Sequence, residues 1–120
     1  MLIVEEDIQQ AALLSERLTE AGVVATIATT SAEAIARITA RCPDAVLLDV
    51  TFELSARTGV GLVAMVRVIA PELPMVVMSG FDVALAIEIQ SIGVGYIEKP
   101  IEVELLKDIL AEQLAVRKTA

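Results

Sequence analysis

The sequence predicts an α/β fold in which five parallel strands form one sheet, with helices packed on both of its faces. Two observations carry this prediction. Short apolar runs alternate with longer segments of helical spacing along all 120 residues. The composition is 56% hydrophobic but only 2% aromatic, which suits an aliphatic sheet that is buried on both faces. A chain of this length is expected to form a single domain over residues 1–120.

The alternation assigns a position to each element. The strands are expected at residues 2–5, 23–28, 45–49, 75–78 and 95–98. The helices are expected at about residues 7–21, 32–40, 60–69, 83–92 and 103–116. Short strands that alternate with long helices imply parallel pairing with right-handed crossovers.

Capping and stop residues define the elements of the first half. Leucines recur at helical spacing up to Leu18, and Gly22 is a natural stop for this first helix. The apolar stretch that follows is the second strand. Thr30 belongs to a Thr-Thr-Ser segment that supplies the N-cap of the second helix, where Glu33 complements the helix dipole. Pro43 then precedes the third strand, which is a continuous apolar run.

Prolines and glycines divide the second half in the same way. The third helix runs up to a turn that Pro71 and Pro74 bracket. The fourth strand is short and apolar, and the fourth helix ends before Gly93. In the last helix, Glu104 lies near the N-terminus and basic residues lie at the end, as the dipole favours. These units predict a flavodoxin-like (βα)5 three-layer sandwich with the strand order 2-1-3-4-5.

Charge and residue content exclude several functions. The net charge is −8 and no basic cluster occurs, so nucleic-acid binding by this domain is not expected. The chain has no histidine, which excludes Ser-His and Cys-His nucleophile pairs, histidine-ligated zinc and a phosphohistidine of its own. No apolar run reaches the roughly 18 residues of a membrane span, and no leader precedes the first strand, so we expect a cytoplasmic protein.

Acidic residues and one lysine follow the strands of the predicted sheet. Glu5 and Glu6 follow the first strand, Asp49 ends the third, and Lys99 follows the fifth. The carboxyl ends of parallel strands share one edge, where open α/β folds place their ligand sites. Two carboxylates about 4 Å apart repel by about 4 kcal/mol at an effective dielectric of roughly 20, so this edge needs positive charge. Lys99 supplies one charge, and the oxygen donors favour Mg²⁺ as the source of the rest.

These residue types also suit one reaction. A carboxylate can attack a phosphoryl donor and form an acyl phosphate when nearby positive charge neutralises the transferred group. Asp49 is the best nucleophile candidate because it stands alone at the end of the central strand. Ser79, at the end of the fourth strand, would donate a hydrogen bond to the phosphoryl oxygens.

Four segments in this order and spacing resemble the receiver domain of two-component response regulators. They are Ile3-Val4-Glu5-Glu6-Asp7, Val46-Leu47-Leu48-Asp49, Val76-Val77-Met78-Ser79-Gly80 and Tyr96-Ile97-Glu98-Lys99-Pro100. The chain is similar to stand-alone, chemotaxis-type receivers, and the resemblance covers residues 2–116.

The resemblance implies a role for each residue at the sheet edge. Asp49 matches the phosphoacceptor aspartate, and Lys99 matches the lysine that pairs with the acyl phosphate. Glu5 and Glu6 match the acidic pair that binds Mg²⁺ together with Asp49, with Glu6 as the direct ligand. The backbone carbonyl of Thr51 would complete the metal site.

The resemblance also implies a partner and a switch. A histidine kinase or histidine phosphotransfer protein would donate the phosphoryl group, so the chain would be a signalling phosphoacceptor and not an enzyme. Phosphorylation would draw Ser79 inward and bury Tyr96. The face formed by the fourth helix, fifth strand and fifth helix would then change, and it would bind an effector or a second copy of the chain. A fourth helix richer in apolar residues than packing on the sheet requires supports such a surface.

The sequence departs from the family pattern in three places. Both positions of the acidic pair are glutamates, whereas the family commonly has at least one aspartate there. The extra methylene of glutamate shifts the carboxylate oxygens. The loop at residues 51–61 is longer than usual and has no proline. Thr51 and Phe81 occupy positions that would tune the lifetime of the acyl phosphate, and the ring of Phe81 would hinder water.

Two alternatives use the same fold. A pseudo-receiver would not be phosphorylated and would serve as a protein interaction module. A flavin or nucleotide binder would need a glycine-rich phosphate loop after the first strand, and the sequence has none there.

Overall fold

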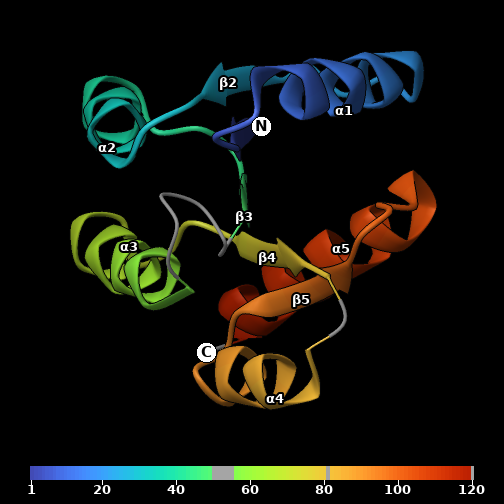
Figure 1. Cartoon of the computed structure of the whole chain (residues 1–120). Coiled ribbons are helices and arrows are strands. Elements are labelled where there is room, and N and C mark those ends of the chain that lie inside the picture. Colours follow the sequence, from blue (N-terminus) through green and yellow to red (C-terminus); the bar gives the residue numbers. More distant parts are fainter. Residues whose placement is uncertain (50–55, 81, 120) are drawn as a thin grey trace.

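Five strands form one parallel sheet in the computed structural model, which describes residues 1–49, 56–80 and 82–119 (Figure 1). The strands are β1 (Leu2–Val4), β2 (Thr26–Ala28), β3 (Val46–Asp49), β4 (Met75–Ser79) and β5 (Gly95–Glu98). Their order is β2-β1-β3-β4-β5 and every pairing is parallel, which confirms the predicted fold class and strand order. The central position of β1, β3 and β4 explains why these strands are almost wholly apolar.

Five helices connect the strands and cover both faces of the sheet. They are α1 (Ile8–Glu20), α2 (Ser31–Ala40), α3 (Ala56–Ile69), α4 (Val83–Ser91) and α5 (Val103–Thr119). In Figure 1, α1 and α5 lie on one side of the sheet and α2 and α3 on the other. None of the helices in the described part of the chain has the length and apolar character to cross a membrane.

β2 and α3 begin at residues clearly different from their predicted starts. β2 begins at Thr26 and not at residue 23, because the backbone N–H of Val23 still donates to Leu18 O at 2.8 Å and belongs to the end of α1. Gly22 makes this turn possible with a φ of 85°. α3 begins at Ala56, before the predicted start near residue 60. The end of the loop expected at residues 51–61 is therefore helical.

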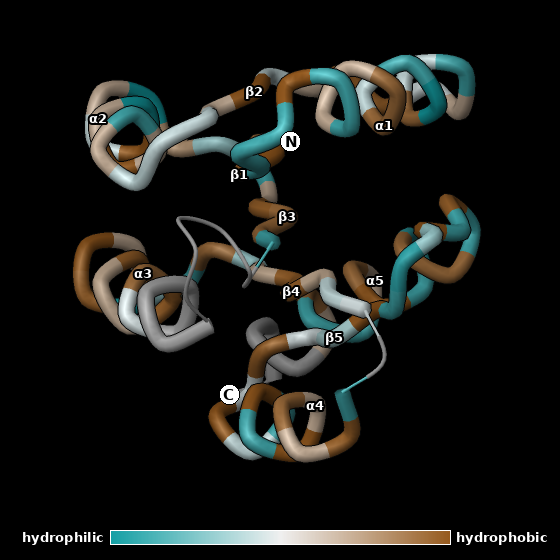
Figure 2. The backbone as a smooth tube through the Cα atoms, viewed as in Figure 1, coloured by the Kyte–Doolittle hydropathy of each residue, from teal (hydrophilic) through white to brown (hydrophobic). Residues whose placement is uncertain are grey.

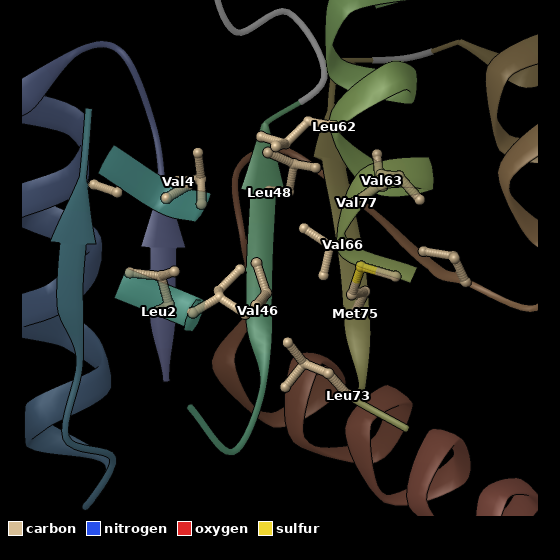
Figure 3. Close-up of a cluster of buried hydrophobic side chains, with 14 of the residues drawn as sticks. Leu2, Val4, Val46, Leu48, Leu62, Val63, Val66, Leu73, Met75 and Val77 are labelled. Atoms are coloured by element: carbon tan, nitrogen blue, oxygen red, sulfur yellow. The ribbon is translucent and has the colours of Figure 1, made fainter. Parts of the chain in front are cut away.

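The core consists of two apolar layers, one on each face of the sheet. Alternate strand residues supply them, so that Leu2 and Val4 lie in one layer and Ile3 lies in the other. Figure 3 shows the layer that α2, α3 and α4 cover. The second layer lies under α1 and α5. Figure 2 shows apolar residues recurring along α3 and α4, in keeping with this burial.

Strand register brings the polar strand ends to one edge. Val4 pairs with Leu48, and Asp49 pairs with Met78, so β1, β3 and β4 end at nearly the same level. Ser79 pairs with Glu98 at the end of β5. The edge predicted to hold the site therefore exists, and the residues that follow β1 and β5 reach it from opposite sides of β3.

Candidate functional site

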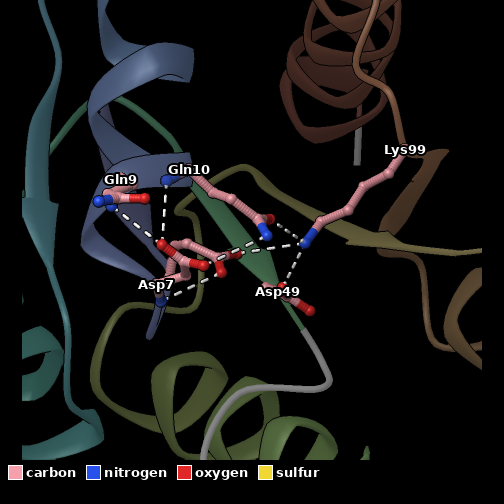
Figure 4. A network of polar contacts seen from close by, with 6 residues as sticks. Asp7, Gln9, Gln10, Asp49 and Lys99 are labelled. Atoms are coloured by element: carbon pink, nitrogen blue, oxygen red, sulfur yellow. Dashed lines mark hydrogen bonds and ion pairs between the residues drawn. The ribbon is translucent and has the colours of Figure 1, made fainter.

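A lysine lies between two buried carboxylates at this edge of the sheet. Lys99 Nζ is 2.6 Å from Asp49 Oδ2 and 3.3 Å from Glu5 Oε2 (Figure 4). Glu5 and Asp49 are only 5% and 2% exposed, whereas the Lys99 side chain is 30% exposed. The ion pair thus has acids inside the fold and a cation that enters from the surface. Because they are shielded from water, these charges interact far more strongly than an exposed pair would.

Backbone hydrogen bonds fix both Lys99 and Glu5 to neighbouring strands of the sheet. Lys99 N donates to Ser79 O at 2.8 Å, which fixes the end of β5 to the end of β4. The Lys99-Pro100 peptide bond is cis. On the other side of the site, Glu5 N donates to Ala28 O at 3.1 Å and continues the pairing of β1 with β2.

The chain turns from β1 into α1 directly beside the site. Asp7 is the N-cap of α1, and its Oδ1 accepts from Gln9 N at 3.0 Å and Gln10 N at 3.2 Å. Asp7 N in turn donates to Glu5 Oε1 at 3.3 Å. The helix start therefore orients the Glu5 carboxyl group, because one of its oxygens is bound to the N-cap and the other to Lys99.

Gln10 is a member of this cluster that the sequence analysis did not identify. Its Oε1 accepts from Lys99 Nζ at 3.3 Å, and its amide donates to Asp7 Oδ2 at 3.4 Å (Figure 4). The signal was present in the sequence: a polar side chain three residues after an N-cap folds back toward that cap. Asp7 and Gln10 have this spacing, so Gln10 could have been placed near Glu5.

The titration behaviour of Glu5 and Lys99 follows from burial and mutual charge. The pKa of Glu5 is raised to about 7, by burial first and then by a hydrogen bond with Asp49 and the charge of Asp49, against the opposing charge of Lys99. For Lys99, burial lowers the pKa, but the hydrogen bond and charge of Asp49 outweigh it and the pKa lies above its ordinary value. The lysine stays protonated while Glu5 exchanges its proton near neutral pH.

The donor set at this edge suits a hard divalent cation. Mg²⁺ needs only one or two protein carboxylates and keeps several waters, and Glu5 and Asp49 supply two carboxylates. Glu6 is exposed, and Thr51 lies outside the described residues. Within residues 1–49, 56–80 and 82–119, no set of three or more acidic, histidine or cysteine side chains lies close enough to hold a metal. The magnesium site stays a prediction.

The two residues predicted to act as a switch lie on neighbouring strands. Ser79 is buried at the end of β4. Tyr96 is half-buried on β5, packs against the layer under α4, and donates its hydroxyl to Gly80 O at 2.9 Å. The tyrosine is therefore bound to the residue that directly follows Ser79. Phe81, the other residue predicted to influence the site, lies outside the described residues.

Together these residues can accept an electrophile that carries negative charge. Asp49 offers a carboxylate in a largely water-excluded position, and Lys99 neutralises charge within hydrogen-bond distance of it. Glu5, Asp49 and Lys99 include no thiol and no imidazole, and Asp49 is the carboxylate that lies nearer to the lysine.

Comparison with known proteins identifies similar chains. The family model of the response regulator receiver domain matches residues 1–111. The receiver domain of NtrX from Brucella abortus is 28% identical with a TM-score of 0.83, and the match covers 95% of this chain and 97% of that one. A putative response regulator from Chloroflexus aurantiacus J-10-fl is 30% identical with a TM-score of 0.78, covering 92% of this chain and 95% of that one. A search of curated proteins gave no match.

One similar structure is of a longer chain. NtrX from Brucella abortus in complex with ADP is 27% identical with a TM-score of 0.83, and the match covers 98% of this chain. It covers only 26% of the NtrX chain, so the present sequence spans about a quarter of that protein.

Proposed function

The chain belongs to the response regulator receiver domain family, and from this we propose that it takes a phosphoryl group onto Asp49 from a partner phosphohistidine. Receiver domains are signalling phosphoacceptors rather than conventional enzymes, and they work in two-component systems with kinases or phosphotransfer proteins. The observation that carries the proposal is the placement of Lys99 Nζ 2.6 Å from the buried carboxylate of Asp49.

The transfer follows from the chemistry of the cluster. A carboxylate oxygen of Asp49 attacks phosphorus, the bond from phosphorus to the partner's imidazole nitrogen breaks, and that nitrogen keeps the electron pair. Lys99 would pair with the phosphoryl oxygens, because its Nζ lies beside Asp49 and its raised pKa keeps it charged. The donor histidine must lie outside this 120-residue sequence, which contains none.

Glu5 and Asp49 would hold Mg²⁺, with Glu6 and the Thr51 carbonyl as the further ligands that the family resemblance suggests. When bound, the cation neutralises negative charge on the phosphoryl oxygens. The chain's own contribution is to present two carboxyl groups at the edge of the sheet and to keep their surroundings largely free of water. Ionisation of Glu5, whose pKa is about 7, would accompany metal binding.

The proposed output is a change in the face formed by α4, β5 and α5. Support comes from the Tyr96 hydroxyl, which is bound to Gly80 next to Ser79. A phosphoryl group that draws Ser79 inward would move this carbonyl acceptor. Support also comes from α4, whose Val83 and Ile87 are 54% and 64% exposed although both are apolar. This face would meet an effector or a second copy of the chain.

Intact-mass measurement of the domain with Mg²⁺ and acetyl phosphate tests the proposal. We expect the parent to gain one phosphoryl group and Asp49→Asn to gain none. Asp44→Asn is the matched control, because Asp44 is exposed at the opposite end of the same strand segment and should not affect labelling. Labelling that persists in Asp49→Asn would refute the assignment of the acceptor.

A folded parent that gains no phosphoryl group would favour the pseudo-receiver. One observation keeps this second function in view: the described residues place two acids, and not three, beside Lys99. In that case the apolar surface of α4 would be the functional part of the chain, and it would bind its partner without phosphorylation.

A further inference from the structure

Two side chains of α1 reach across to the segment that carries the lysine. Arg17 Nη2 donates to Ile101 O at 2.6 Å, and Gln10 Oε1 accepts from Lys99 Nζ at 3.3 Å. The partners are 84 and 89 residues apart in the sequence. These contacts lie on either side of Pro100, so α1 holds the lysine segment at the side-chain tip and at the backbone.

Open space separates the helix and this segment between the two contacts. A cavity of about 430 Å³ lies there, bounded among others by Leu13, Arg17, Lys99 and Pro100. Side chains do not fill this space, so the polar contacts of Gln10 and Arg17 connect α1 to the lysine segment there. The Ile101 side chain is buried in the layer under α1 and α5, and its backbone carbonyl accepts separately from Arg17.

The position of Lys99 Nζ depends on the backbone on both sides of the residue. On one side, Lys99 N is bound to Ser79 O at 2.8 Å. On the other side Pro100 has no N–H to bind, and the bond from Arg17 to Ile101 O is the next anchor. Lysine has a long flexible side chain, so a small displacement of its backbone is passed on to the ammonium group.

We propose that Arg17 is a positioning residue for Lys99, which acts by fixing the Ile101 carbonyl and thereby keeps Nζ against Asp49. The inference rests on the proposed function, since it gives Arg17 a role in phosphoryl transfer. Arginine suits this role because its guanidinium is always charged, and a charged donor makes a stronger hydrogen bond to a carbonyl than a neutral one.

A matched control separates positioning from ordinary stabilisation. Lys107 of α5 makes the same type of contact to the C-cap of α1, where its Nζ donates to Ala21 O at 3.0 Å. Lys107→Gln therefore removes another cation-to-carbonyl contact of α1, but one that does not involve the segment carrying Lys99. Arg17→Gln removes the proposed anchor, and Arg17→Lys keeps the charge and can restore part of the contact.

The first readout is the Lys99 ammonium signal in nitrogen-15 NMR of the unphosphorylated protein, assigned with Lys99→Arg. We expect hydrogen exchange at this ammonium to be about tenfold faster in Arg17→Gln, partly restored in Arg17→Lys and unchanged in Lys107→Gln. The second readout is the rate of labelling by acetyl phosphate, which should fall by about tenfold in Arg17→Gln alone.

An unchanged Lys99 signal in Arg17→Gln would overturn the inference, and so would an equal change in Lys107→Gln. If Arg17→Gln does not fold, Arg17→Lys decides the question by the same comparison. If the parent takes no phosphoryl group, the proposed function fails, but the NMR comparison still shows whether Arg17 positions Lys99.

Discussion

Glu5→Gln should abolish a pH dependence of stability that the site imposes on the parent. Burial, together with the hydrogen bond and charge of Asp49, raises the pKa of Glu5 from 4.5 to about 7. The folded state then binds the proton more tightly than the unfolded state. The contribution of Glu5 is complete below about pH 4.5 and is lost as the pH rises through about 7. A shift of this size corresponds to about 3 kcal/mol.

Urea unfolding in the presence of a chelator measures this effect. We expect parent and Glu5→Gln to differ little near about pH 4.5, because glutamine resembles the protonated acid. At about pH 8 the variant should be more stable by about 3 kcal/mol. The control is Glu72→Gln, since Glu72 is exposed and should follow the parent at both pH values. A difference between parent and Glu5→Gln that stays constant with pH would refute the reasoning.

Further changes have defined outcomes in the same unfolding assay. Gly61→Ala should stabilise the chain by up to about 1 kcal/mol, because Gly61 is exposed within α3 and an added Cβ meets nothing within 4 Å. Gly95→Ala should destabilise it by about 1–3 kcal/mol, because the added Cβ would lie 2.6 Å from Ile109 Cγ2. Ile89→Ala should lower stability by about 2–5 kcal/mol, since Ile89 is fully buried. Mg²⁺ should raise the thermal midpoint of the parent more than that of Glu5→Gln at alkaline pH, where the parent carries the ionised acid.

Sequence reasoning predicted the fold well where local signals and topology agree. The N-cap at Thr30 and the stop at Gly22 are both observed, with Thr30 Oγ1 accepting from Glu33 N at 3.1 Å. The start of β2 was wrong because two apolar residues after Gly22 have the composition of a strand. The backbone of the first of them, Val23, however, completes the turn that ends α1. Composition cannot distinguish these two uses of valine.

The meeting of Glu5, Asp49 and Lys99 was predictable for a topological reason. Parallel strands end at one edge, so residues that follow neighbouring strands converge whatever lies between them in the sequence. The contacts of Gln10 and Arg17 were not predicted, since they depend on how far α1 is rotated about its axis and on how the loop after β5 runs. The roles assigned to the site residues stay predictions; these residues are Glu5, Glu6, Asp49, Thr51, Ser79, Phe81, Tyr96 and Lys99.

The charge balance of the cluster suits the proposed binding of both a cation and a phosphoryl group at one site. Two buried carboxylates face one lysine, so the fully ionised cluster has one negative charge in excess. Protonation of Glu5 removes the excess at low pH. As the pH rises through the pKa of Glu5, which is about 7, the group loses this proton. A divalent cation would take over that task and recover up to the roughly 3 kcal/mol that ionisation of Glu5 costs. The charge imbalance that destabilises the cluster without a cation would thus add to its affinity for the cation. The cation and Lys99 together would then neutralise the negative charge that a phosphoryl group brings to Asp49.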